Sequence, residues 1–297
     1  QNHFDLPVDA LGILRTDHPH YYRGKQGGET EDEFVDRIVG NLEAMIVAEG
    51  PDTIAAFIAE PITGASGVIV PPDGYYQKVQ AVLNRYDIMF WADEVITGFG
   101  RTGTDFGCNT MGIESPDMMT FAKQLSSAYM PISASAIRRD MYDAMIEQTA
   151  TAGAFGHGYT YSGHPVACAV ALKVLEIYQR DDIFQNAAIT GAYLQKRLAE
   201  FSDHPLVGEV RGSGLLGAIE LVANKEQGTP FLGGAVGGYA QKMAQDNGLL
   251  IRAVAGSSLG FCPPLIITEE QIDEMIAKVG SALDQTYIHC QKHGLLV

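Results

Sequence analysis

Cysteines, basic residues and long apolar runs are scarce in this sequence. Its four cysteines are widely spaced and form no CxxC pair, so free thiols in a reducing cytoplasm are the simplest interpretation. No apolar run approaches the length of a membrane span, and no secretory signal is present. The 20 lysines and arginines stand against 36 acids, and the net charge of -16 argues against binding to nucleic acid or anionic membranes.

The rest of the composition is that of an ordinary globular protein. With 297 residues and 46% apolar content, the chain can bury a large core, in one domain or in a large and a small one. The first part alternates between strand and helix patterns, which predicts an α/β fold with a mainly parallel sheet and right-handed crossovers. The expected helices are 29–49 and 74–86, and the expected strands are 53–62, 88–95, 117–122 and 131–137.

The second part predicts a smaller α+β domain. The glycines of VGEVRGSGLLGAIELV mark a turn between two strands, and LLIRAVAG and LGFCPPLIIT form another strand pair. GSGLLG matches a loose GxGxxG pattern, but no helix follows it, so a nicotinamide dinucleotide site is not expected. The expected helices are 165–179, 183–201, 235–246 and 269–289.

The stretch from Phe90 to Pro131 places an acid and an amine at the ends of two predicted strands. Asp93 ends the first strand, and Lys123 follows the second. Open α/β sheets bind their ligands at this edge. We interpret Lys123 as an amine that forms a Schiff base with an aldehyde cofactor, pyridoxal phosphate. Asp93 would keep the nitrogen of the cofactor ring protonated, so that the ring accepts electrons.

Each of these two residues has a simpler structural explanation when taken alone. A single aspartate at the end of a strand is usually a turn or cap residue, and a single lysine is usually solvated. Lys123, however, directly follows the apolar run MMTFA, where a solvated lysine is less expected. Two serines come soon after it, Ser126 and Ser127, and hydroxyl groups can donate hydrogen bonds near a phosphate.

Four longer motifs resemble the class III, fold type I, pyridoxal-phosphate aminotransferases, and most closely their amine–pyruvate or omega-transaminase group. The resemblance extends from DLPVD near the start of the chain to the final helix. Family members carry a substantial part before this point, so we expect the sequence to be the C-terminal two-thirds of a longer enzyme. The motifs are IAAFIAEPITGASGVIVPP, WADEVITGFGRTG, FAKQLSSAYMPISA and FGHGYTYSGHPVACAVAL.

The resemblance implies a domain division and further site residues. It implies a large cofactor-binding domain over 1–180, lacking its N-terminal part, and a small domain over 181–297. Val95 is expected to pack on a face of the cofactor ring, and Glu60 of the AEP motif to lie at the cofactor. Thr160 would reach the cofactor phosphate of the partner subunit, which implies a homodimer. His157 and His164 are given structural roles.

Two positions bear on the substrate. The amine–pyruvate group has an arginine at the position of Arg252 that meets a substrate carboxylate, although Arg252 is equally well explained as a surface residue of an edge strand. Ornithine- and aminobutyrate-type relatives instead carry an arginine where this chain has Gly260, paired with the Glu of the AEP motif. Gly260 therefore disfavours those substrates and leaves the role of Glu60 open.

The expected reaction is transamination between an amine donor and a keto acid such as pyruvate. Lys123 would move the substrate proton, Asp93 would hold the ring nitrogen and Arg252 the keto acid carboxylate. A racemase, aminomutase or decarboxylase would use the same lysine and aspartate. An incomplete, inactive α/β scaffold is the alternative without catalysis.

Overall fold

The computed structural model describes residues 12–297, and the expected DLPVD similarity lies outside these residues. The chain divides into two compact units by its contacts. The first unit comprises the residues up to 56 together with 71–88, and the second comprises 57–70 and 89–297. In the described part of the chain, none of the helices is both long and apolar enough to cross a membrane.

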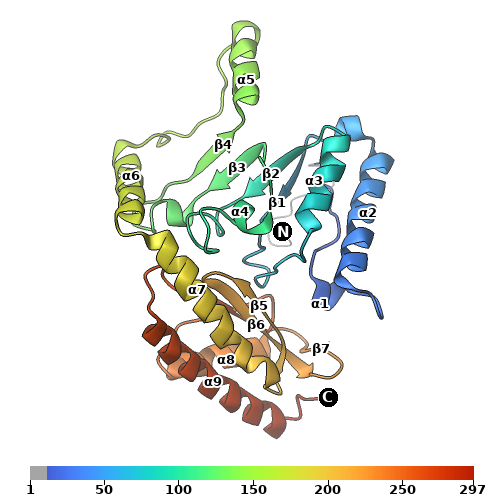
Figure 1. Ribbon diagram of the computed structural model, residues 1–297, viewed down its shortest axis with the longest axis vertical. Helices are drawn as coiled ribbons and strands as arrows, with labels where there is room; N and C mark the ends of the chain where they lie inside the picture. Colours follow the sequence, from blue (N-terminus) through green and yellow to red (C-terminus); the bar gives the residue numbers. More distant parts are fainter. Residues whose placement is uncertain (1–11) are drawn as a thin grey trace. The chain divides into compact units, whose positions relative to one another are not determined.

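The first unit is built on a helix that the apolar pattern predicted, α2 (Glu31–Glu49). Thr30 caps it: the Glu33 amide donates to the Thr30 hydroxyl, and the Thr30 amide donates to the Glu33 carboxylate. Its stripe of Phe34, Ile38, Leu42 and Ile46 is buried. This unit also holds α1 (Tyr21–Gly24), the 3₁₀ helix η2 (Pro51–Thr53) and α3 (Tyr75–Arg85), which packs on α2 (Figure 1).

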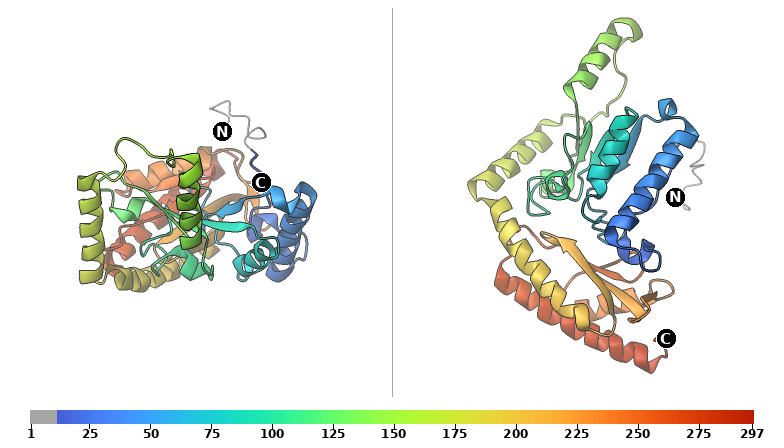
Figure 2. Two further views of the ribbon diagram at one scale, coloured as in Figure 1. Left: turned by 90° about the horizontal axis from the view of Figure 1, so that it is seen from above. Right: turned by 45° about the vertical axis from the view of Figure 1, so that its right-hand side comes forward.

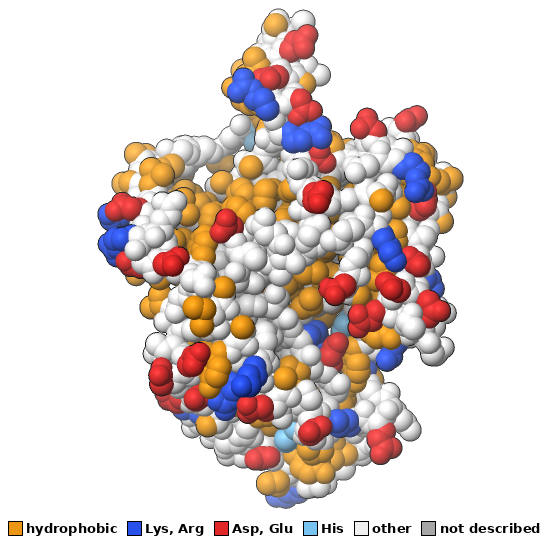
Figure 3. Space-filling model, viewed as in Figure 1, with side chains coloured by type: hydrophobic (Ala, Val, Ile, Leu, Met, Phe, Trp, Pro, Cys, Tyr) orange, Lys and Arg blue, Asp and Glu red, His pale blue; other side chains and the backbone are white. Residues whose placement is uncertain are grey.

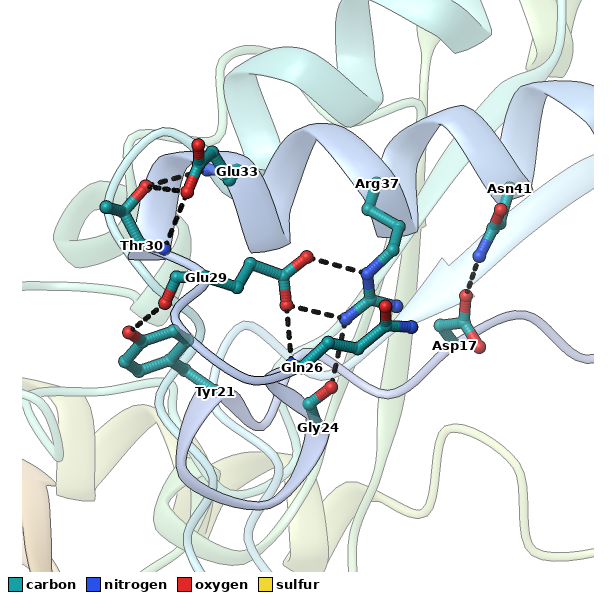
Figure 4. Close-up of polar contacts among 9 residues, drawn as sticks. All are labelled: Asp17, Tyr21, Gly24, Gln26, Glu29, Thr30, Glu33, Arg37 and Asn41. Carbon is teal, nitrogen blue, oxygen red and sulfur yellow. Dashed lines mark hydrogen bonds and ion pairs between the residues drawn. The ribbon is translucent and has the colours of Figure 1, made fainter.

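An ion pair fastens the segment before α2 to the helix itself. Arg37 donates from Nε to Glu29 Oε1 at 2.7 Å and from Nη2 to Glu29 Oε2 at 2.9 Å, and Nη2 also donates to the Gly24 carbonyl (Figure 4). The bond from Arg37, with a further bond from the Gln26 amide, lowers the pKa of Glu29 from 4.5 to about 2. The helix therefore holds this loop through a paired carboxylate.

The second unit contains a four-stranded sheet in the order β1-β2-β3-β4. Strands β2 and β3 are parallel, as predicted, but β3 and β4 are antiparallel. Between β3 and β4 the chain forms only the 3₁₀ turn η3 (Lys123–Leu125), and a parallel return would need a longer crossover. The strands are β1 (Ala56–Ala59), β2 (Met89–Asp93), β3 (Met118–Phe121) and β4 (Ala134–Ile137).

Two helices of this unit were not predicted from the sequence. α4 (Gly107–Met111) is a single short turn, and α5 (Arg139–Ala152) has no buried residue. α5 extends away from the end of β4 (Figures 1 and 2). Met141, Tyr142, Met145 and Ile146 recur at helical spacing in α5, but none of them is buried in the structure. The next helix, α6 (Pro165–Arg180), matches its prediction and begins with proline at its first position.

The C-terminal part forms an antiparallel sheet in the order β5-β6-β9-β8, with β7 pairing to β6. The two predicted strand pairs are confirmed by β5–β6 and β8–β9. The strands are β5 (Val207–Ser213), β6 (Leu216–Asn224), β7 (Thr229–Pro230), β8 (Arg252–Val254) and β9 (Ser258–Phe261). The helices are α7 (Ile183–Ala199), η4 (Glu200–Asp203), α8 (Ala235–Asp246) and α9 (Glu269–Lys292).

The glycines of the GSGLLG segment allow neighbouring backbone segments to pack closely. A Cβ at Gly214 would lie 2.3 Å from the Thr102 carbonyl carbon, and one at Gly191 would lie 2.6 Å from the Gly214 backbone. Gly214 also has a left-handed φ of +56°. The β5–β6 turn, α7 and the glycine-rich loop around Thr102 therefore meet backbone to backbone. One continuous buried core runs from Phe99 in that loop to Cys290 in α9.

Candidate active site

The parallel pairing of β2 with β3 brings the predicted acid and amine to one edge of the sheet. Asp93, the last residue of β2, is the register partner of Thr120 in β3. Lys123 follows Thr120 by three residues and begins η3. Neighbouring strands are about 4.8 Å apart, so both residues leave the sheet at the same end.

Asp93 is half-buried, and its side chain stabilises the turn that follows it. Its Oδ1 accepts a hydrogen bond from the Val95 amide at 3.0 Å. This bond orients the carboxylate and also fixes Val95, which is itself half-buried. The predicted carboxylate and the residue expected beside a ring are thus parts of one local turn.

Lys123 has an unusual backbone for its residue type. Its φ is +41°, in the left-handed region, and its side chain is exposed. A non-glycine residue in this region costs roughly 1–3 kcal/mol and persists only where its surroundings enforce it. Such strain is typical of functional positions, and here it falls on the predicted amine.

Glu60 connects the acid and the amine electrostatically. It follows β1, and its Oε2 accepts a hydrogen bond from the Gly64 amide at 2.8 Å. Burial raises the pKa of Glu60, the negative charge of Asp93 raises it further, and the positive charge of Lys123 lowers it. Both charges therefore act on Glu60, which makes the three residues one cluster of charges at this edge.

Glu94 is a site residue that the sequence interpretation missed. It is fully buried, with 0% of its surface exposed. Its Oε2 accepts from the Thr97 hydroxyl at 2.5 Å and the Gly107 amide at 2.9 Å, and its Oε1 accepts from the Cys108 amide at 2.7 Å. The carboxylate caps the N-terminus of α4 and closes the glycine-rich loop directly after Asp93. Burial and the neighbouring Glu94 raise the pKa of the Cys108 thiol.

A buried arginine fixes the loop that follows Glu60. Arg211 of β5 donates from Nε and Nη2 to the Gly67 carbonyl at 2.9 and 2.7 Å. Glu209 and Glu220 pair with its Nη1 at 2.5 and 2.6 Å, so two carboxylates more than balance its single positive charge. Gly67 has φ +112°, and a Cβ there would lie 3.0 Å from Arg211 Nη2. The C-terminal sheet therefore supports the loop that carries Glu60.

The remaining predicted residues lie elsewhere in the chain. Thr160 is exposed in the loop before α6, and His164 is the residue that precedes this helix. Arg252 is exposed at the start of β8, in the C-terminal sheet rather than the sheet of Asp93. The roles expected for Thr160 and Arg252 thus remain predictions.

The fold, together with the cluster of Asp93, Lys123 and Glu60, is characteristic of one class of proteins. Residues 14–283 match the family model "Aminotransferase class-III". The chain belongs to this family, whose fold type I architecture was predicted from the sequence and is confirmed.

Particular relatives share about half of their residues with this chain. "Gamma aminobutyrate transaminase 3, chloroplastic" of Solanum lycopersicum is 49% identical over 284 residues, which cover 95% of this chain and 54% of that protein. Among solved structures, an omega transaminase from Pseudomonas jessenii in complex with PMP is 47% identical, with a TM-score of 0.94, and is matched over 99% of this chain and 64% of its own. "Transaminase with L-ala" is 50% identical, with a TM-score of 0.93 and coverage of 96% and 67%. The chain spans about half the length of the curated relatives it matches.

Class III aminotransferases use pyridoxal phosphate, and the residues at the sheet edge fit that cofactor. An exposed primary amine and an oriented carboxylate leave the same end of two adjacent parallel strands. This is the donor set that an aldehyde on a pyridine ring requires: an amine for the aldehyde and an anion for the ring nitrogen.

Proposed function

We propose that the protein transfers an amino group between an amine donor and a keto acid such as pyruvate, with pyridoxal phosphate held on Lys123. The observation that carries this proposal is the charge cluster of Asp93, Lys123 and Glu60 at the carboxyl edge of the sheet. Relatives named as transaminases support this activity, and the residues of the cluster have the chemistry that it requires.

Each residue of the cluster has a separate task in this proposal. The Lys123 amine would hold the aldehyde of the cofactor, and the same amine, once free, would carry the proton taken from the substrate carbon. Asp93 keeps a negative charge fixed at the ring nitrogen, oriented by the Val95 amide. When bound, the cofactor supplies an electron-accepting ring. Val95 would pack on that ring, and Glu60 would lie close to it.

The proposed keto acid site uses Arg252. A guanidinium binds a carboxylate through two parallel hydrogen bonds, and Arg252 is exposed on an edge strand. The case against aminobutyrate that rested on Gly260 is not supported by the relatives, because several proteins about half identical to this chain are named gamma-aminobutyrate transaminases. We therefore propose a donor range that includes amino acids with a distal amine.

We propose a homodimer in which Thr160 reaches the cofactor phosphate of the partner subunit. The surface that would form it is exposed and aromatic: Phe155, Tyr159 and Tyr161 are 61%, 80% and 79% exposed. Hydrophobic side chains also gather below α5 around β3 and β4 (Figure 3). Such a patch is typical of a protein interface.

We also propose that the large and the small domain divide between residues 180 and 181. We propose a reducing, cytoplasmic location, which suits the four free cysteines.

Replacing Lys123 tests the reaction directly. Lys123→Ala is expected to lose the visible absorbance of protein-bound pyridoxal phosphate. It is also expected to lose amino transfer from donor to pyruvate, because Lys123 is the amine assigned to the cofactor aldehyde. Lys173→Ala, on the exposed face of α6, is the control. An unchanged spectrum in Lys123→Ala would reject the assignment. Product formation without any keto acid would instead identify a racemase, aminomutase or decarboxylase.

A further inference from the structure

The segment that begins at Lys123 holds an unusual concentration of left-handed backbone. Lys123, Ser127 and Ala128 have φ values of +41°, +47° and +62°, and none of them is glycine. Side chains with a Cβ disfavour this region, because the Cβ approaches the backbone carbonyl. Contacts from outside the segment must therefore hold it in this conformation.

Tyr178 of α6 supplies these contacts through its hydroxyl group. The phenol oxygen lies 2.9 Å from the Gln124 carbonyl and 2.5 Å from Ser127 Oγ. A carbonyl can only accept, so the phenol proton goes to Gln124, and the Ser127 hydroxyl donates to the phenol oxygen. The Tyr178 side chain thereby links the Gln124 carbonyl, one residue after Lys123, to Ser127, the second left-handed residue.

The position of Tyr178 is itself fixed by the core. The residue is 7% exposed, and its ring packs against Phe184 with the ring centroids 5.4 Å apart. Leu125, inside the strained segment, belongs to the same buried cluster. Burial raises the pKa of Tyr178, so the phenol stays a neutral donor. Leaving a buried hydroxyl without a partner is costly, which favours the bonded arrangement.

We propose that Tyr178 is a positioning residue for Lys123, acting through Gln124 and Ser127 to hold the left-handed turn that presents the Lys123 amine. The inference rests on the proposed function only for the role of that amine. The turn and its hydrogen bonds stand without it. The packing of α6 in the core then determines the direction in which the Lys123 amine is presented.

Hydrogen exchange and a spectroscopic titration test this inference with one variant. Tyr178→Phe removes the hydroxyl and keeps the ring against Phe184. Amides of residues 123–130 are expected to exchange about tenfold faster, because the turn loses its two outside bonds. The pH midpoint of the absorbance of pyridoxal phosphate bound to the protein is expected to move by about half a unit, because the amine is presented differently. Tyr193→Phe, which removes a hydroxyl bound to Asp273 at 2.7 Å, is the matched control and is expected to change neither.

Unchanged exchange in residues 123–130 of Tyr178→Phe overturns the inference. Faster exchange with an unmoved midpoint also overturns it, because the tyrosine would then serve stability alone. Ser127→Ala gives a second test at a partly buried position, should Tyr178→Phe fold poorly, and is expected to accelerate exchange in the same segment. If the unaltered protein takes up no pyridoxal phosphate, the proposed function fails, while the exchange measurement still decides whether Tyr178 holds the turn.

Discussion

Arg252 and Gly260 are direct register partners across the β8–β9 pair. Opposite residues of an antiparallel pair project from the same face of the sheet, about 5 Å apart. The resemblance gave substrate arginines at these two positions to different groups of relatives. The structure shows that both positions serve one face of one hairpin.

This pairing predicts that an arginine can be moved across the hairpin. Arg252→Ala is expected to raise KM for pyruvate about 10–100-fold, because a charge-assisted hydrogen bond contributes about 1.5–3 kcal/mol. Adding Gly260→Arg is expected to restore part of that loss. A Cβ at Gly260 would lie 3.4 Å from Val254 Cγ2, which is close but tolerable. Steady-state kinetics with pyruvate as the varied substrate measures both, and an unchanged KM in Arg252→Ala refutes the carboxylate role.

Asp93→Asn tests the charge at the ring nitrogen separately from the geometry of the turn. The amide oxygen of asparagine can still accept the Val95 amide, so the backbone turn should persist. We expect kcat to fall at least about 100-fold, as on loss of one preorganised electrostatic group, while covalent cofactor uptake on Lys123 remains. Absorbance and single-turnover amino transfer distinguish the two effects. Asp52→Asn, on an exposed 3₁₀ turn, is the control, and full activity in Asp93→Asn would contradict the role.

Glu94→Gln is expected to destabilise the protein more than it affects local chemistry. The neutral amide weakens three hydrogen bonds to a fully buried carboxylate, and its NH₂ group would face the amides of α4. We expect the free energy of unfolding to fall by about 1–3 kcal/mol, measured by urea denaturation. Glu226→Gln changes the same charge at an exposed turn and should have little effect. Equal stability of the two variants would show that Glu94 does not anchor the loop.

The Glu29–Arg37 pair predicts a pH-dependent stability for the first unit. The bond from Arg37 lowers the pKa of Glu29 from 4.5 to about 2. Its contribution is complete above the pKa of the unfolded chain and is lost as the pH falls through about 2. The stability difference between the unaltered protein and Glu29→Gln should therefore shrink as the pH is lowered from about 5 to 2. Urea midpoints across this range measure it, and a constant difference would exclude the linkage.

The sequence predicted most elements whose buried face repeats at short range. The apolar stripe of α2 and the strand ending at Asp93 were placed within a few residues of their observed bounds. α5 was not predicted, although its apolar residues recur at helical spacing, and the antiparallel direction of β4 was not predicted, because strand patterns carry no sign of pairing direction. Glu94 gave no signal beyond its place after Asp93, because two of its three partners are amides more than ten residues away.

By itself, the sequence determined most of the strands and helices, the family and the acid and amine at the sheet edge, because these depend on local periodicity and contiguous motifs. Only the tertiary structure decided how that edge is held. Arg211 reaches the loop after Glu60 from a strand more than one hundred residues further on, and Tyr178 reaches the turn of Lys123 from another helix. Such contacts arise when distant segments share one core, and no local pattern encodes them.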